Sequence, residues 1–343
     1  MANSADIPII DLAGDRADIA LQLVNAAEEH GFIYIRNKGL DIAPQDIDGA
    51  FSLSKKIFDS PVEEKKQCSI QQNNRGWSGM HSEVLDPSTQ KVGDYKEAFN
   101  FGEFIDGKAQ QPLPPSIAND EPLISAFADS CHNLCRRILL LLGVGLGVDD
   151  FFSAAHNTSH GASDSILRLL RYPAAESTAH GDEDVRAGAH SDYGSVTLLF
   201  RLKGQAGLEI LKRDNSWAPV PVSPPGTEND PSPPILVNIG DLLSYWTNGL
   251  FRSTVHRVVF PTDGSNAVAG ETASGARYSI AFFCHPAGSV TLDPVPSDRV
   301  KNFKASSDTP NVNPYAERKV VTAQEHLMMR LKATYPGVYD KEL

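Results

Sequence analysis

Apolar residues recur at intervals of three and four in the first half of the chain, the spacing that marks one face of a helix. One such run extends from Ile19 to Ala27 and is followed by Gly31, a residue type that commonly closes a helix. A second run begins near Pro44, since proline suits the first helical turn. A third, over about 122–142, predicts a long helix with an apolar inner face: Ile124, Phe127, Cys131, Leu134, Ile138 and Leu141.

The second half of the chain changes to short runs of strand-forming residues separated by turn residues, which is typical of a β-sandwich or barrel. A segment rich in Pro, Gly and Ser over 221–234 is expected to be a surface loop, and a final helix is expected over about 323–335. In the first half, one short strand is predicted at 32–35, and 73–102 is expected to be irregular. The later strands are predicted at 166–171, 196–200, 208–211, 217–220, 235–238, 254–260, 278–284 and 290–292.

Composition narrows the class of protein. Of the 343 residues, 41% are hydrophobic, which is enough for a sizeable core, and no change in composition requires separate domains. The formal net charge of −12 argues against nucleic acid as a partner and fits an enzyme of small molecules, although simple solubility explains this charge equally well. We take a monomer as the default.

Cysteine usage and apolar segments bear on location. Four cysteines are few for this length, which favours a reducing compartment, and we expect a cytoplasmic protein. No signal peptide is expected, because no basic segment followed by an apolar stretch stands at the start. The best candidate for a membrane span, 138–142, is far too short, so no membrane partner is expected. Cys131 and Cys135 could hold a metal, but buried thiols on a helix core face are the simpler interpretation.

The strongest chemical signal is the pair His190 and Asp192, followed far downstream by His256. Residues i and i+2 of a β-strand point to the same side, so His190 and Asp192 can converge on one ion. Two imidazoles and one carboxylate can occupy one face of a six-coordinate metal and leave the opposite face free. This is the ligand set of non-haem Fe(II) oxygenases.

A second signal lies on a neighbouring predicted strand, where Arg277 and Ser279 share one face. A guanidinium group with a hydroxyl beside it suits a carboxylate, bound through two charge-assisted hydrogen bonds. The alternative for Arg277 is a surface ion pair. Zinc is the rival metal, since two histidines and a carboxylate can also hold it, but a metallohydrolase has no need of a clamp for a dicarboxylate.

Segments spread in order along nearly the whole chain resemble the isopenicillin N synthase-like family of Fe(II)/2-oxoglutarate-dependent oxygenases. Each segment alone is a weak signal, whereas the ordered set is strong. The set comprises residues 7–12, 31–35, 167–173, 189–195 and 238–242, together with Arg277 and Ser279.

The resemblance implies a mainly β fold: a jelly roll, or double-stranded β-helix, flanked by helices. We expect an N-terminal helical and mixed region at 1–160, the oxygenase core at 161–295 and a C-terminal extension with a helix at 296–343. By the same resemblance, His190, Asp192 and His256 hold Fe(II). Arg277 and Ser279 hold the distal carboxylate of the co-substrate 2-oxoglutarate, and Tyr172 is a further contact to it.

Two positions depart from the family pattern. The family often has a polar residue where Leu170 stands, which removes one co-substrate contact. The interval between His256 and Arg277 is also longer than usual, and 262–276 is expected to be a hairpin loop rich in Gly, Ser and Ala. Asp241 invites a catalytic role, but turn chemistry at the end of a strand is the better interpretation.

The family resemblance implies oxidation by Fe(II), O2 and 2-oxoglutarate, with succinate and CO2 as products. The outcome is hydroxylation, desaturation or ring rearrangement of a small organic molecule, which we expect to be a secondary metabolite. Two alternatives stay open: an Fe(II) oxidase of the same fold that does not use 2-oxoglutarate, and a non-catalytic binding protein. Candidate substrate contacts, each with packing as its alternative, are Arg75, Trp77, Phe99, Asn100 and Phe283.

Overall fold

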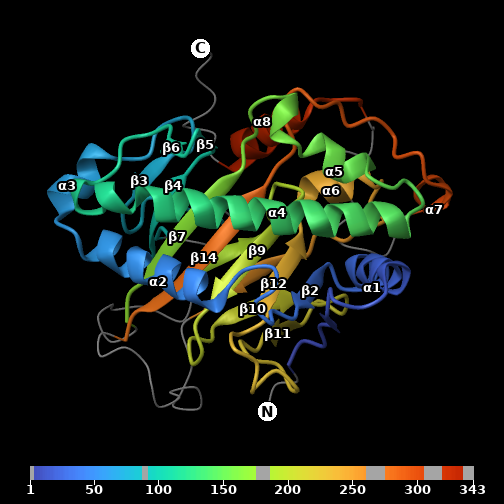
Figure 1. Cartoon of the computed structure of the whole chain (residues 1–343), viewed down its shortest axis with the longest axis horizontal. Helices are drawn as coiled ribbons and strands as arrows, with labels where there is room; N and C mark the ends of the chain where they lie inside the picture. The colour runs from blue at the N-terminus through green and yellow to red at the C-terminus, as the bar shows by residue number, and fades with distance from the viewer. Residues whose placement is uncertain (1–3, 87–91, 175–185, 260–274, 305–318, 335–343) are drawn as a thin grey trace.

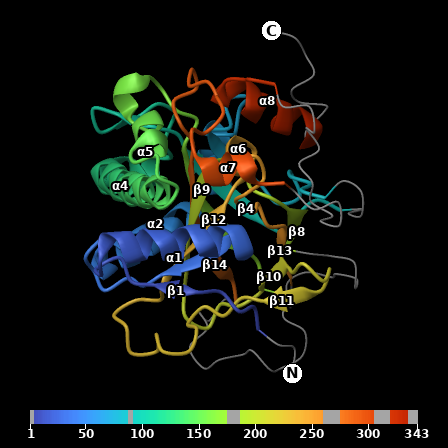
Figure 2. The same ribbon diagram turned by 90° about the vertical axis from the view of Figure 1, so that its right-hand side faces the viewer.

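The computed structural model of the chain describes residues 4–86, 92–174, 186–259, 275–304 and 319–334. Two β-sheets face each other at its centre, and helices cover the outer side of the larger sheet (Figures 1 and 2). The larger sheet has the order β1 (Ile9–Ile10), β2 (Phe32–Ile35), β12 (Ile235–Ile239), β9 (Val196–Arg201), β14 (Arg277–Cys284), β7 (Ile166–Tyr172), β4 (Glu97–Phe101) and β3 (Gly76–Ser78). The smaller sheet has the order β11 (Trp217–Pro219), β10 (Leu208–Leu211), β13 (His256–Val258) and β8 (Ala187–His190).

Three long helices form a layer on the larger sheet: α1 (Arg16–Glu29), α2 (Pro44–Asp59) and α4 (Glu121–Gly145). Figure 1 shows α2 and α4 crossing in front of the strands, with α1 beside them near β2. Their apolar faces and the outer face of the sheet make one buried core. The remaining elements are α3 (Val62–Gln67), β5 (Phe104–Ile105), β6 (Lys108–Ala109), η1 (Pro115–Asp120), α5 (Phe151–Ala155), η2 (Thr158–His160), α6 (Asp241–Trp246), α7 (Asp298–Asn302) and α8 (Ala323–Thr334).

The central strand β14 shows how the sequence divides the interior. Its alternate residues Tyr278, Ile280 and Phe282 join the core beneath the helices. The residues between them face the smaller sheet, where a second, smaller core lies. Arg277 and Ser279 belong to this second face, so the alternation directs them into the space between the two sheets.

The two facing sheets confirm the expected jelly-roll architecture, although the sheets do not join at their edges among the described residues. Helices α1, α2 and α4 begin and end within a few residues of the predicted bounds, and α1 closes at Gly31, where φ is +67°. The strands predicted from 166 to 284 are present, with starts and described ends within two residues. Segment 221–234 has no helix or strand, as expected for a loop.

Two predictions of local structure were wrong. Segment 73–102 is not irregular, because it supplies β3 and β4 at the edge of the larger sheet. All five residues of β4 are buried, so it shows no alternation that the sequence could reveal. Segment 290–292 forms only an isolated bridge between Thr291 and Thr322 instead of a strand. The hairpin loop expected at 262–276 lies almost entirely outside the described residues, as does the end of the last helix at Tyr335.

All four cysteines are buried and free, which agrees with the packing interpretation of Cys131 and Cys135. In the described part of the chain, no helix has the length and apolar character needed to cross a membrane.

Candidate active site

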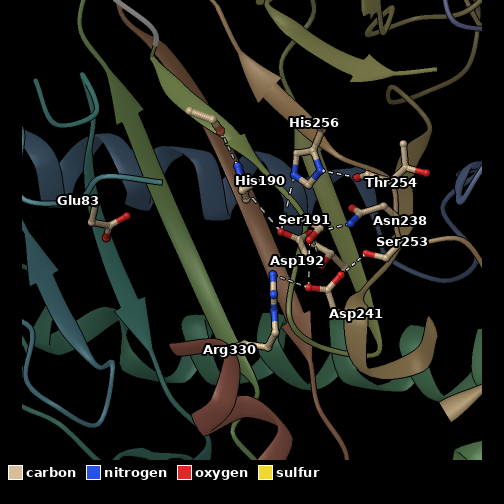
Figure 3. Close-up of polar contacts among 12 residues, drawn as sticks. Glu83, His190, Ser191, Asp192, Asn238, Asp241, Ser253, Thr254, His256 and Arg330 are labelled. Carbon is tan, nitrogen blue, oxygen red and sulfur yellow. Dashed lines mark hydrogen bonds and ion pairs between the residues drawn. The ribbon is translucent and has the colours of Figure 1, made fainter. Parts of the chain in front are cut away.

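His190 and His256 lie side by side on the smaller sheet. His190 ends β8, His256 begins β13, and they are register partners with ring centroids 4.4 Å apart. Asp192 stands two residues beyond His190, in the segment after the strand instead of on it, and its carboxylate still reaches both rings (Figure 3). One ligand atom from each residue lies within 4.8 Å of the others, so the three side chains can share one metal ion.

The backbone fixes the orientation of both imidazoles. Nδ1 of His190 lies 2.7 Å from the carbonyl oxygen of Gly188, and Nδ1 of His256 lies 3.1 Å from that of Thr254. A carbonyl oxygen can only accept, so each Nδ1 carries a proton, and in the neutral imidazole the lone pair then lies on Nε2. The Nε2 atoms face Oδ1 of Asp192 at 3.9 Å for His190 and 3.7 Å for His256.

The two oxygens of Asp192 have separate environments. Oδ2 accepts hydrogen bonds from Oγ1 of Thr197 at 2.7 Å and from Nδ2 of Asn238 at 2.6 Å. Oδ1 faces the two Nε2 atoms. Hydrogen bonds of this kind hold a metal ligand in orientation, so the carboxylate offers one oxygen to the site and keeps the other for the protein.

The protonation states also suit a cation. Burial works to raise the pKa of Asp192, but the two imidazoles and the two hydrogen bonds outweigh it and lower that pKa below its ordinary value. Burial and the neighbouring His256 lower the pKa of His190 to about 4. The site therefore presents an ionised carboxylate and an imidazole with an available lone pair at neutral pH, which is the donor set that Fe(II) requires.

A buried guanidinium group lies in the same space. Arg277 is 3% exposed, and its Nε donates to the carbonyl oxygens of Gln205 and Ala206 at 3.3 and 3.0 Å. Its guanidinium carbon stands 4.8 Å from the centre of the Tyr172 ring. Nη1 has no hydrogen-bond partner among the described residues, and burial lowers the pKa of this arginine. An unsatisfied buried cation needs an anion, so Nη1 fits a carboxylate from a bound molecule.

One cavity of about 150 Å³ joins the metal triad to this arginine. Arg277, Ser279 and Tyr172 line one part of it, with Leu170 beside them. Because six residues of extended chain span about 20 Å, Phe283 on the same face of β14 stands well away from Arg277. The cavity thus has one end at Arg277 and a second end, which is lined in part by Ile166, Arg168, Ala281, Phe283, His285, Leu327 and Leu331.

A buried charged cluster forms part of the cavity wall. Lys96 lies 3.1 Å from Glu83 and also pairs with Asp94, while Arg168 pairs with the other oxygen of Glu83. Burial works to raise the pKa of Glu83, but Arg168 and Lys96 outweigh it and lower this pKa to about 2. Lys96 and Arg168 both line the cavity, and their charges are balanced by the two carboxylates.

The side chain of Asp241 makes contacts that its interpretation as a turn residue did not predict. Its backbone begins α6 directly after β12, which agrees with that interpretation. Its carboxylate accepts hydrogen bonds from Ser191 at 3.0 Å and Ser253 at 2.6 Å, and it pairs with Arg330 at 2.9 Å (Figure 3). Burial raises its pKa, although Arg330 and the two hydroxyls act in the opposite direction.

Of the five candidate substrate contacts, the structure places Phe283 at the cavity. Phe99 is fully buried in the core beneath the helices, and Trp77 packs against that core while its indole donates to Glu97 at 3.0 Å. Arg75 lines a separate small hollow. Asn100 does not line the cavity, but its amide donates to the carbonyl oxygen of Asn74 at 3.0 Å, and Asn74 does line it.

Several cavity residues escaped the sequence reasoning. His285, which the sequence analysis did not single out, is buried and lines the cavity. Its position continues the alternation of Arg277, Ser279, Ala281 and Phe283, so the period of two could have found it. The same period of two places Arg168 on the same face of β7 as Tyr172. No comparable signal marks Asn74 or the α8 residues, because they reach the cavity from distant segments.

Comparison with protein families agrees with this geometry. Residues 7–121 match a family described as the N-terminal region of a non-haem dioxygenase in morphine synthesis. Residues 163–286 match the 2OG-Fe(II) oxygenase superfamily. The second match contains all three residues of the metal triad and the Arg277/Ser279 pair.

The chain is also similar to individual proteins. The chain is 36% identical over 300 residues to UPF0676 protein C1494.01 of Schizosaccharomyces pombe, with 85% of each chain covered. It is 32% identical over 288 residues to the 2-oxoglutarate-dependent dioxygenase gloF of Glarea lozoyensis, with 78% of this chain and 81% of that one covered. The crystal structure of a full-length Neurospora crassa protein in complex with alpha-KG and thymine superposes with a TM-score of 0.75 at 29% identity, covering 96% of this chain and 97% of that chain.

These matches extend over most of the chain and of its relatives, and they accompany a His-Asp-His cluster that can bind metal. The cofactor of this family is Fe(II), and its co-substrates are 2-oxoglutarate and O2. The chain belongs to the 2OG-Fe(II) oxygenase superfamily and is a non-haem Fe(II)/2-oxoglutarate-dependent dioxygenase.

Proposed function

We propose that this dioxygenase oxidises a small organic molecule, a secondary metabolite with apolar or aromatic character, by hydroxylation, desaturation or ring rearrangement. His190, Asp192 and His256 would hold Fe(II), and Arg277, Ser279 and Tyr172 would hold the distal carboxylate of 2-oxoglutarate. When bound, Fe(II) supplies the oxidising power together with O2 and 2-oxoglutarate, and succinate and CO2 are released.

One observation carries the assignment of these residues: the cavity that contains the triad also contains a buried arginine with an unsatisfied Nη1. Arg277 is held in place by two backbone carbonyls and by the Tyr172 ring, so its free edge has a fixed direction. Ser279 lies two residues further on the same face and adds a hydroxyl. A dicarboxylate with one end on the metal fits this arrangement.

The role of the protein around the metal is positional. Gly188 and Thr254 keep the two Nε2 atoms directed inward, and Thr197 and Asn238 restrict Asp192 to one available oxygen. Fixed ligands need no rearrangement when the metal binds, which favours a single geometry. Residues of the two sheets and of α8 line this space.

The far end of the cavity supports the substrate class. Ile166, Ala281, Phe283, Leu327 and Leu331 present aliphatic and aromatic groups, and His285 with Arg168 adds polar groups for orientation. A cavity of this size admits a small molecule and not a folded polymer. The similar Neurospora crassa structure was solved with thymine, which is a small heterocycle.

The test is a screen of small molecules for succinate release, with Fe(II), 2-oxoglutarate and O2 supplied. We expect apolar or aromatic compounds to raise succinate release in the wild type and not in His190→Ala. Mass spectrometry then separates the reactions, since hydroxylation adds an oxygen atom and desaturation removes two hydrogens. If nucleic acid or peptide substrates raised succinate release and small molecules did not, the proposed substrate class would be wrong.

A further inference from the structure

We propose that Arg330, on the C-terminal helix α8, is a positioning residue for the metal site and acts through Asp241. The inference rests on the proposed function, because it assumes that His190, Asp192 and His256 hold the metal. It goes further, because it treats α8 and the two chain segments that carry the metal ligands (the metal-binding segments) as one rigid unit.

The first step is the contact between α8 and Asp241. A guanidinium Nη of Arg330 lies 2.9 Å from Oδ2 of Asp241, and the two side chains are only 19% and 18% exposed. The guanidinium carbon also stands 5.1 Å from the centre of the Tyr193 ring. Figure 3 shows Arg330 extending from its helix toward the carboxylate. A pair with such restricted exposure is screened less by solvent than a surface pair.

The second step is the connection from Asp241 to the metal ligands. Its Oδ2 accepts from Ser191, the residue between two of the ligands, and its Oδ1 accepts from Ser253, three residues before His256. Its backbone N–H donates to the carbonyl oxygen of Asp192 at 2.7 Å. One carboxylate therefore ties together both segments that carry the triad, and Arg330 holds that carboxylate from the other side.

The third step is the position of the rest of α8. Leu327, Arg330 and Leu331 are spaced three and four residues apart, which puts them on one face of the helix. The two leucines line the active-site cavity. The start of the helix is attached elsewhere, since Ala323 and Gln324 donate backbone hydrogen bonds to Val290 and Gly288. The anchor at Arg330 thus secures the part of α8 that forms the cavity wall.

A physical consequence follows from this chain of contacts. If α8 and the metal-binding segments form one unit, binding of metal and 2-oxoglutarate must make α8 more rigid, and loss of the anchor must weaken metal binding. Such coupling is reciprocal by thermodynamic necessity. The rigidity of the cavity wall at the substrate end would then depend on whether the metal site is occupied.

The experiment measures amide hydrogen exchange in 323–334, with and without Fe(II) and 2-oxoglutarate, under anaerobic conditions. We expect both ligands together to slow exchange at least about fivefold in the wild type, the lower end of common coupling strengths. Arg330→Met, which keeps the length and removes the charge, should abolish this slowing, and Arg330→Lys should restore part of it. Fe(II) affinity should fall in parallel in Arg330→Met.

The matched control is Arg299→Met, which removes an arginine that pairs with Glu28 on the surface, away from the cavity. It should leave the slowing unchanged. Ser253→Ala is a milder variant in case Arg330→Met fails to fold, because it removes one hydrogen bond to Asp241 and leaves Arg330 in place. It should reduce the slowing.

Two results would overturn the proposal: exchange in α8 that does not respond to the ligands in the wild type, or equal slowing in wild type and Arg330→Met. Failure of the proposed function is a distinct result, since Fe(II) and 2-oxoglutarate would then not bind the wild type at all. In that case, exchange in the ligand-free proteins still tests the anchor. Equal rates in wild type and Arg330→Met would reject it.

Discussion

Asp192 assigns its two carboxylate oxygens to different tasks, and this division explains why a buried carboxylate is stable there. Oδ2 is satisfied by Thr197 and Asn238, so the cost of burying it is offset within the protein. Oδ1 and the two Nε2 atoms remain for the metal. In the sequence, the spacing of His190 and Asp192 reveals the ligands, but nothing marks the two residues that orient them.

Arg277 leads to the first prediction. Arg277→Ala should raise the 2-oxoglutarate concentration needed for binding by at least about thirtyfold, because loss of a buried charged partner costs about 2–5 kcal/mol. Arg277→Lys should be intermediate, since an ammonium group keeps the charge but lacks the planar fork. Calorimetric titration of the anaerobic Fe(II) protein with 2-oxoglutarate measures this directly. Unchanged affinity in Arg277→Ala would reject the clamp.

Glu83 leads to a prediction about pH. Glu83→Gln should lower the free energy of unfolding at pH 7 by roughly 3 kcal/mol, since it leaves two buried cations undercompensated. The pKa of Glu83 is lowered in the folded state to about 2, against an ordinary value of 4.5. Its stabilising contribution is therefore complete above pH 4.5 and is lost as the pH falls from 4.5 toward 2.

Urea unfolding of wild type and Glu83→Gln between pH 7 and pH 3 checks this prediction. The difference between the two proteins should stay constant down to about pH 4.5 and shrink below it. Glu63→Gln is the matched control, because Glu63 is exposed on α3 and should contribute little. A difference that grows on acidification would contradict the assigned pKa.

Among the elements, α1 is closed by a glycine that also brings it near the metal site. At Gly31, a Cβ atom would stand 2.1 Å from the carbonyl oxygen of Arg252 and 2.6 Å from Oγ1 of Thr254. These two residues belong to the segment that leads to His256. The absence of a side chain at Gly31 therefore allows the end of α1 to pack on a segment that carries a metal ligand.

Gly31→Ala should destabilise the protein more than Gly107→Ala. Both glycines have positive φ, +67° and +74°, but a Cβ at Gly107 would meet nothing within 4 Å. Gly107→Ala should cost only the backbone strain of about 1 kcal/mol. Gly31→Ala should cost about 2 kcal/mol more, because the added methyl group overpacks the contact. Urea unfolding of both variants measures the difference, and equal losses would show that the contact is unimportant.

The elements with a clear period were predictable from the sequence, and those without one were not. α1, α2 and α4 bury one face each, and β14 alternates between two buried environments. β8 is not among the runs of strand-forming residues that the sequence predicts, because Ala-Gly-Ala-His contains no β-branched residue and no Phe, Tyr or Trp. Only the spacing of His190 and Asp192 indicated a strand there, and the structure pairs this strand with β13. β4 was missed because Glu97 and Asn100 are buried through partners that only the fold supplies.

At the scale of the whole molecule, the interior holds two buried cores, and the site lies in the second of them, between the two sheets. The helices and the outer face of the larger sheet make one core, and the facing sides of the two sheets make the other. The triad, Arg277 and the α8 leucines meet only when both cores are formed. The pairing of Asp241 with Arg330 illustrates the limit of sequence reasoning, since no local pattern links residues so far apart.

This arrangement predicts that ligands stabilise the whole fold. With free ligand at 100 times its dissociation constant, Fe(II) and 2-oxoglutarate should add about 2.7 kcal/mol and raise the melting temperature. Chelation of the metal by EDTA should reverse the increase. His190→Ala should melt at the same temperature with and without the ligands, and an equal increase in that variant would place the binding site elsewhere.

The measurement that tests the central claim most directly is anaerobic addition of Fe(II) and 2-oxoglutarate, followed by the weak visible charge-transfer band of the iron chelate. The wild type should develop this band without any substrate. His190→Ala and Asp192→Ala should fold but lack the band, and Arg277→Ala should show it only at much higher 2-oxoglutarate concentrations. A band of undiminished intensity in both His190→Ala and Asp192→Ala would contradict the assignment of the metal site.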